Sequence, residues 1–111
     1  MADQFLEDRK KEVSQHKILL YIKGTKEQPQ CGFSAAALQI FNRIGKPYET
    51  INVLTSPDIR RRMEEFSQWP TFPQIFVGGE FVGGCDIVTE LYENGELEKI
   101  VNKAFGETAK K

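Results

Sequence analysis

The stretch KILLYIKGTKEQPQCGFSAAALQIF, residues 17–41, decides the fold of this chain. It opens with the apolar run KILLYIK, whose length and lack of alternation predict a β-strand buried on both faces. The polar loop GTKEQPQ follows and leads to Cys31. From Ser34 the apolar residues recur at helical spacing, and Gly45 ends this pattern. Strand, loop and helix in this order are typical of the first half of a βαβ unit.

The segments that follow predict a small α/β fold. TINV, residues 50–53, predicts a second strand with its isoleucine and valine facing one way, and SPD, residues 56–58, is typical of a helix start. QIFVGGEFVGG, residues 74–84, predicts two short strands joined at a Gly-Gly turn. Asn-Gly at 94–95 separates the last two helices. We therefore predict one domain over residues 1–111, a small mixed sheet with helices on both faces.

The composition excludes several classes of function. The chain has 111 residues, of which 40% are hydrophobic and 28% charged, with a net charge of −1. This balance is that of an ordinary globular domain, and no excess charge draws it to nucleic acid or to acidic membranes. The apolar runs are too short to span a bilayer. Because the N-terminus also lacks a secretory pattern, we expect a cytoplasmic protein, or an organelle protein whose transit segment has been removed.

Cys31 is placed where a thiol becomes reactive. It lies between a polar loop and the first turn of a helix, where unpaired backbone N–H groups favour a thiolate and lower the thiol pKa. Lys23, at the end of the preceding strand, lies at the same carboxyl edge of the sheet, where α/β proteins bind ligands. Two simpler interpretations stay open. Cys31 could be an inert, buried residue, and the Ser34 hydroxyl could support the first helical amides.

Three motifs resemble those of the monothiol glutaredoxins of the CGFS type. They are K-G-T-x-x-x-x-P-x-C-G-F-S at residues 23–34, W-P-T-F-P at residues 69–73 and G-G-C-D at residues 83–86. The similarity covers nearly the whole chain and is closest to the single-domain form of that family. It implies a thioredoxin-like (glutaredoxin) fold, with a small four-stranded mixed sheet flanked by helices.

The resemblance implies that the chain binds glutathione beside Cys31. It implies that Lys23 and an arginine meet the glycyl carboxylate, and the family pattern selects Arg60 among three consecutive arginines at 60–62. A run of charges such as this is otherwise typical of a solvated helix face. The resemblance also implies a cis peptide bond before Pro73, which turns the main chain of Phe72 toward the cysteinyl part of glutathione. A trans bond is the ordinary expectation for a proline.

The other end of glutathione is assigned to the G-G-C-D motif. The resemblance implies that the backbone N–H of Cys85 and the carboxylate of Asp86 hold the γ-glutamyl group. From the sequence alone, a helix-capping role for Asp86 is the simpler interpretation. His16, the one histidine, falls in a polar turn, and we expect it to be exposed and to have no ligand role.

A site with one thiol, Cys31, and a serine at position 34 is compatible with two main functions. A [2Fe-2S] cluster needs four sulfur ligands, and Cys31 plus one glutathione from each protomer of a homodimer would supply them. A serine at position 34 removes a thiol that would otherwise form a disulfide with Cys31. The resemblance then implies a cluster carrier that passes its cargo to apo iron-sulfur proteins, often with a BolA-type partner.

The alternative is a glutathione-dependent thiol-disulfide oxidoreductase, because one thiolate suffices to attack a protein–glutathione disulfide. The long loop before Cys31 is linked in the family to weak activity of this kind, so we favour the carrier. A redox or iron sensor whose output is protein binding is the third hypothesis.

Overall fold

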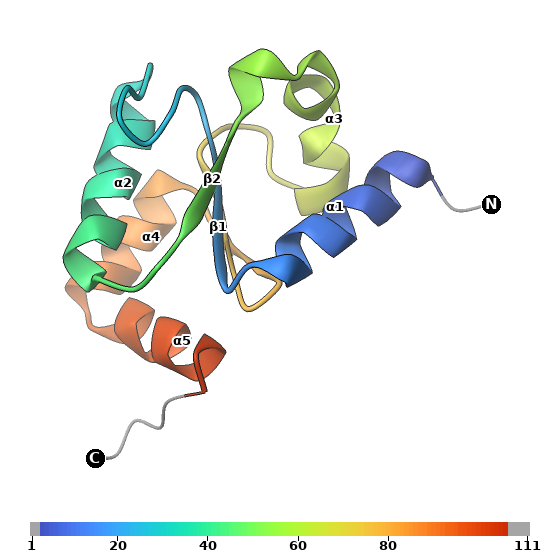
Figure 1. The fold of residues 1–111 in the computed structure, drawn as a ribbon. Helices are drawn as coiled ribbons and strands as arrows, with labels where there is room; N and C mark the ends of the chain where they lie inside the picture. The colour runs from blue at the N-terminus through green and yellow to red at the C-terminus, as the bar shows by residue number, and fades with distance from the viewer. Residues whose placement is uncertain (1–2, 107–111) are drawn as a thin grey trace.

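A computed structural model describes residues 3–106 of the chain (Figure 1). Five α-helices, four β-strands and one short 3-10 turn occur in these residues. In chain order they are α1 Gln4–Gln15, β1 Ile18–Ile22, α2 Gly32–Ile44, β2 Glu49–Asn52, η1 Val53–Thr55, α3 Pro57–Ser67, β3 Gln74–Val77, β4 Glu80–Gly83, α4 Cys85–Glu93 and α5 Glu96–Ala104.

The strands form one mixed sheet in the order β2-β1-β3-β4. β1 pairs parallel with β2 and antiparallel with β3, and β4 returns antiparallel beside β3. The predicted βαβ unit and hairpin are therefore confirmed. Gly78 and Gly79 both have positive φ, at 63° and 83°, as the two central residues of a tight hairpin turn require.

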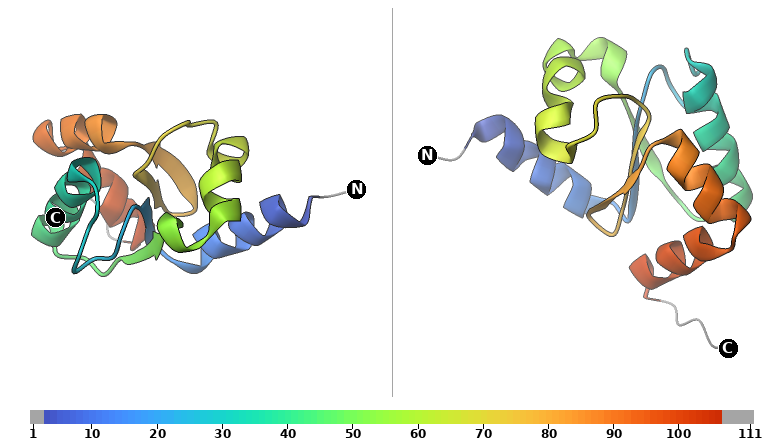
Figure 2. Two further views of the ribbon diagram at one scale, coloured as in Figure 1. Left: turned by 90° about the horizontal axis from the view of Figure 1, so that it is seen from above. Right: turned by 180° about the vertical axis from the view of Figure 1, so that it is seen from behind.

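Helices cover both faces of the sheet, with α2, α4 and α5 on one side and α1 and α3 on the other (Figure 2). β1 lies between these layers, and all of its residues are buried. Ile18, Leu20 and Ile22 belong to the core cluster that includes Phe41, Val88 and Leu97. Leu19 and Tyr21 face the opposite cluster. This confirms the prediction of a strand buried on both faces.

Two element boundaries differ from the sequence prediction. α2 begins at Gly32, two residues before the apolar pattern that starts at Ser34, and Cys31 is its N-cap residue, between the loop and the first turn as predicted. β2 ends at Asn52, and Val53 opens the 3-10 turn instead of ending the strand. The Asn52 side chain causes this second change, because its Oδ1 accepts the N–H groups of Leu54 and of Gly24, at 2.9 and 3.0 Å.

The pairing register brings the sequence motifs to one edge of the sheet. β1 and β2 are parallel and end side by side, with Ile22 opposite Asn52. β3 is antiparallel to β1, so it begins at this edge, with Gln74 opposite Tyr21. β4 ends there too, with Gly83 opposite Ile75. The segments that follow or precede these strand ends carry every residue predicted for the site.

In residues 3–106 no helix has the length and apolar character needed to cross a membrane.

Candidate functional site

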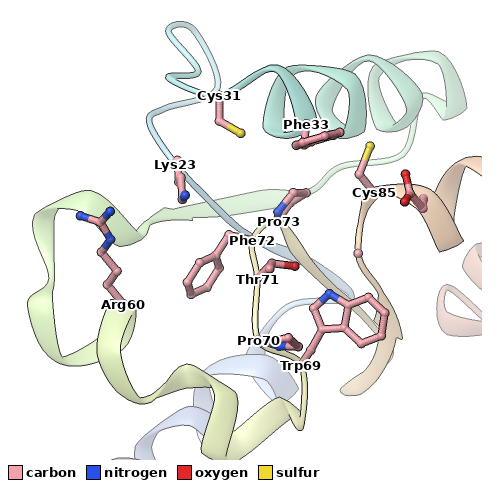
Figure 3. Close-up of a pocket in the computed structure, with 12 residues that line it drawn as sticks. Lys23, Cys31, Phe33, Arg60, Trp69, Pro70, Thr71, Phe72, Pro73 and Cys85 are labelled. Atoms are coloured by element: carbon pink, nitrogen blue, oxygen red, sulfur yellow. The ribbon is translucent and has the colours of Figure 1, made fainter.

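A pocket of about 540 Å³ lies at this edge of the sheet (Figure 3). It contains all six residues that the sequence analysis assigned to a site. Lys23 and Arg60 lie on one side, Cys85 lies on the other, and Phe72 lies between them (Figure 3). The residues that line the pocket are Lys23, Cys31, Phe33, Arg60, Trp69, Pro70, Thr71, Phe72, Pro73, Gly84, Cys85 and Asp86.

The helix start and nearby groups lower the pKa of Cys31. The backbone N–H of Ser34 has the largest effect on the thiol pKa, and the N–H of Phe33, the Lys23 ammonium and the Ser34 hydroxyl lower it further. Partial desolvation acts in the opposite direction. Cys31 is half-buried and is a free thiol. The prediction that the helix start lowers the thiol pKa is therefore confirmed, and Cys31 is not the fully buried residue of the alternative interpretation.

Ser34 does not support the helical amides as one interpretation suggested. Its side chain is fully buried, and its Oγ accepts the backbone N–H of Lys23 at 3.1 Å. The N-cap position of α2 has no side-chain capping bond. The hydroxyl instead ties the first turn of α2 to the residue that follows β1, which fixes the position of Cys31 relative to Lys23.

The loop between β1 and Cys31 is closed by its own backbone. Gln30 donates to the Lys23 carbonyl at 2.8 Å, and Thr25 donates to the Gln28 carbonyl at 3.1 Å. Gly24 has a φ of +103°, and a Cβ there would lie 2.5 Å from the Gln28 oxygen, so only glycine fits. From the outer part of the loop, the Lys26 ammonium donates to the Tyr48 carbonyl at 2.6 Å.

The structure separates the three consecutive arginines. Arg61 pairs with Asp58 at 2.8 Å, and Arg62 pairs with Glu65 at 2.9 Å and with Asp3. Arg62 also lies over the Phe5 ring, 4.6 Å from its centroid. Arg60 is the arginine that lines the pocket, and within residues 3–106 its guanidinium makes no ion pair. Lys23 and Arg60 thus give one end of the pocket two cations that face a common space.

The opposite end of the pocket is the start of α4. The N-cap residue is Gly84, which has no side chain for a capping bond, and Asp86 lies in the first turn. The simpler interpretation of Asp86 as the helix cap is therefore wrong. Its carboxylate is exposed at the pocket instead. The Cys85 sulfur lies 3.9 Å from the Thr89 hydroxyl, one turn further along the same helix.

The Trp69–Pro73 segment forms the floor between the two ends. The Phe72–Pro73 bond is cis, as the resemblance implied, and it is the one cis bond in residues 3–106. Two buried side chains that the sequence analysis did not single out hold this segment. Ser67 accepts the Trp69 N–H at 3.1 Å, and Gln74 donates to the carbonyls of Trp69 and Thr71 at 2.9 and 3.1 Å. A glutamine in an otherwise apolar strand is the signal that could have identified Gln74.

His16 is half-buried rather than exposed, so this expectation was wrong. It lines a second, smaller hollow with residues that include Pro47, Tyr48 and Phe105. It lies in the short connection between α1 and β1. It is remote in the fold from the edge that carries Cys31.

The lowered pKa predicts the pH dependence of Cys31 alkylation. Because only the thiolate reacts, the rate should rise with pH and level off above the thiol pKa. We expect the midpoint of this rise to fall below that of an unfolded peptide with the sequence of residues 28–34. In Lys23→Gln the midpoint should move upward, since a positive charge that favours the thiolate is lost. Iodoacetamide labelling, followed by mass spectrometry to separate Cys31 from Cys85, measures both. A midpoint equal to that of the peptide would contradict the prediction.

The fold and the pocket together define a thioredoxin-like protein with a thiol of lowered pKa at the start of α2. The family model named Glutaredoxin matches residues 18–82. The "Probable monothiol glutaredoxin 2" of Rickettsia felis is 50% identical over 98 residues, which cover 88% of this chain and 91% of that protein. The chain belongs to the glutaredoxin family, among its monothiol members.

Solved structures support the same fold. The solution structure of reduced poplar apo GrxS14 has a TM-score of 0.81 and 45% identity, and the match covers 93% of this chain and 94% of that chain. A buckwheat glutaredoxin, solved as a glutathione complex, has a TM-score of 0.78 at 22% identity, with 97% of this chain and 100% of that chain covered. At that identity the second match shows the fold alone.

Proposed function

We propose that this protein carries a glutathione-ligated [2Fe-2S] cluster between two copies of itself and passes it to apo iron-sulfur proteins. The observation that carries the proposal is a thiol of lowered pKa, Cys31, at a pocket with cations at one end and a carboxylate at the other. Glutathione is a tripeptide with a glycyl carboxylate at one end and an α-amino acid group at the other. Its charges match this order along the pocket.

Each charged group of the pocket has a proposed partner in glutathione. Lys23 and Arg60 would bind the glycyl carboxylate with charge-assisted hydrogen bonds. Asp86 would bind the γ-glutamyl ammonium, and the exposed N–H groups at the start of α4 would bind the adjacent carboxylate. The Phe72 main chain would pair with the cysteinyl residue. This orientation brings the glutathione sulfur near Cys31.

The cluster is cargo, and the donor set supports sharing it between protomers. A [2Fe-2S] cluster takes four sulfur ligands. Within residues 3–106 no three His, Cys, Asp or Glu side chains gather in a way that could hold a metal ion. One protomer therefore offers Cys31 and, through its pocket, one glutathione. Two protomers complete the set, and the missing thiol at position 34 leaves Cys31 free to act as a ligand.

A glutathione-dependent oxidoreductase is the second candidate, and the low thiol pKa favours it. The Cys31 thiolate would attack the glutathione sulfur of a protein–glutathione disulfide, so that the target leaves as a thiolate and takes up a proton. A second glutathione thiolate would then attack this sulfur, releasing oxidised glutathione and the Cys31 thiolate. In the family that the chain resembles, the long loop before Cys31 is linked to weak activity of this kind, which supports the carrier as the main role.

Partners and location follow from the carrier role. We propose apo iron-sulfur proteins as acceptors and a BolA-type protein as a second partner of the cluster-loaded form. The cytoplasm is the proposed compartment, because a reducing glutathione pool keeps Cys31 as a thiol.

Anaerobic reconstitution tests the carrier directly. The protein is incubated with iron, sulfide and a reductant, with and without glutathione. We expect visible absorption of a [2Fe-2S] cluster and a dimer in sedimentation only when glutathione is present. A colourless monomer in both samples, together with rapid turnover of glutathione disulfides, would favour the oxidoreductase instead.

Cys85 provides an independent test of the ligand set. A dimer contains two copies each of Cys31 and Cys85, so an all-protein set of four thiolates is arithmetically possible. We expect Cys85→Ser to keep the cluster, the dimer and the requirement for glutathione, because the proposed contact uses the backbone N–H. Absorption spectra and sedimentation of the reconstituted variant check this. If a folded Cys85→Ser protein forms no cluster, Cys85 is a ligand and the proposed stoichiometry is wrong.

A further inference from the structure

The Trp69–Pro73 segment depends on side chains for its backbone hydrogen bonds. It lies between α3 and β3, outside any helix or strand, and Pro70 and Pro73 have no N–H to donate. Its polar groups are bound from both flanks. Ser67, the last residue of α3, binds Trp69, and Gln74, the first residue of β3, binds Trp69 and Thr71.

We propose that Gln74 is a positioning residue that holds the Phe72 main chain toward the ligand. This inference rests on the proposed binding of glutathione. The Gln74 Nε2 group donates to two carbonyls that are two residues apart, Trp69 at 2.9 Å and Thr71 at 3.1 Å. Both partners are acceptors, so they fix which end of the side-chain amide faces the segment. One rigid, fully buried group thus sets the geometry of the segment immediately before Phe72.

The side-chain amide of Gln74 is buried with only one of its two ends hydrogen-bonded. Its side chain is fully buried, and its Oε1 atom has no hydrogen-bond partner among residues 3–106. An unpaired buried acceptor is destabilising, and an apolar side chain of similar size would avoid it while losing the two hydrogen bonds to the Trp69 and Thr71 carbonyls. The rest of β3 is apolar and buried, so such a side chain would suit the strand. The amide at position 74 is therefore better explained by the segment that it holds at the pocket than by packing within the core.

Trp69 extends the effect of Gln74 to the far end of the pocket. Its ring packs on Phe81, with the centroids 5.7 Å apart. At Gly84 a Cβ would lie 2.8 Å from the indole nitrogen, so the tryptophan and the start of α4 are in close contact. A shift of Trp69 would press on the backbone that precedes Cys85. By holding Trp69, Gln74 sets the position of Phe72 and also the separation between Phe72 and α4.

The test replaces Gln74 by methionine, which keeps the length of the side chain and removes the donors. Glutathione binding is measured by calorimetry, and the midpoint of Cys31 alkylation is measured in the same samples. We expect the Kd to rise about tenfold, as for the loss of roughly one well-formed hydrogen bond to the ligand. The alkylation midpoint should stay unchanged, because the groups that lower the Cys31 pKa are in the first turn of α2 and at Lys23. Gln39→Met, at an exposed position of α2, is the matched control and should bind like the wild type.

Ser67→Ala keeps the test decisive if Gln74→Met does not fold. It removes the second anchor of Trp69 and should also raise the Kd without moving the alkylation midpoint. Wild-type affinity in a folded Gln74→Met protein, or in Ser67→Ala when Gln74→Met does not fold, overturns the inference. A shifted alkylation midpoint would show general disruption of the site and overturn it as well. A wild-type protein that binds no glutathione would instead overturn the proposed function on which the inference rests.

Discussion

Cys31→Ser is expected to abolish cluster assembly and thiol chemistry while leaving the fold intact. The substitution changes one atom at a half-buried N-cap position, and serine is itself a favoured N-cap residue. The helix start and the core should therefore be unaffected. The Cys31 sulfur, however, is one of the two ligands that each protomer brings to the proposed cluster, and it is the proposed nucleophile.

The measurements are cluster absorption after reconstitution, glutathione disulfide turnover, and thermal unfolding. We expect no visible absorption and no turnover, with an unfolding temperature close to that of the wild type. Cys85→Ser is the matched control, because it makes the same atomic change at the other cysteine. A Cys31→Ser protein that still assembles a full cluster would defeat both the ligand assignment and the dimer model.

Charge reversal at Lys23 or Arg60 should weaken glutathione binding by an order of magnitude or more. A charge-assisted hydrogen bond to a carboxylate contributes roughly 1.5–3 kcal/mol, and reversal adds repulsion to the loss of that bond. Both side chains line the pocket, and Arg60 makes no ion pair within residues 3–106 that would have to break first. Since the attraction is electrostatic, the difference between variant and wild type should shrink at high salt.

The neighbouring arginine gives the control for Arg60. Arg61→Glu makes the same change one residue away, where the side chain is exposed and pairs with Asp58. We expect a small effect on stability and none on glutathione affinity. Calorimetric titration of the three variants compares them. If Arg61→Glu loses affinity while Arg60→Glu keeps it, the assignment of the carboxylate partner is wrong.

The sequence predicted the elements well because their patterns are local. The apolar run of β1, the capping Ser56, the Gly-Gly turn and the Asn-Gly break each determine structure within a few residues. The sequence predicted the ends of helices and strands less accurately where a contact with a residue distant in the chain determines them. Asn52 ends β2 because its side chain also binds Gly24, 28 residues away in the chain, and neither segment reveals that contact alone.

The sequence could predict which residues form the site, and it predicted the contacts between them less well. The resemblance named the six residues that now lie around one pocket. It could not show that Ser34 binds the backbone of Lys23, or that Gly84 rather than Asp86 occupies the N-cap of α4. Gln74 was missed because its role depends on two carbonyls of a segment without regular structure. Such contacts depend on tertiary packing, and no local periodicity encodes them.

The closed loop before Cys31 also bears on the entropy of binding. Its backbone groups are already paired through Gly24, Gln28 and Gln30, and Lys26 fastens its outer part to Tyr48 without any ligand. A loop that is ordered beforehand loses little conformational freedom when a ligand arrives. More of the interaction energy between the pocket and a tripeptide then remains as affinity. The loop loses its conformational entropy when the chain folds rather than when a ligand binds. The thiolate is therefore in the same place for each incoming molecule.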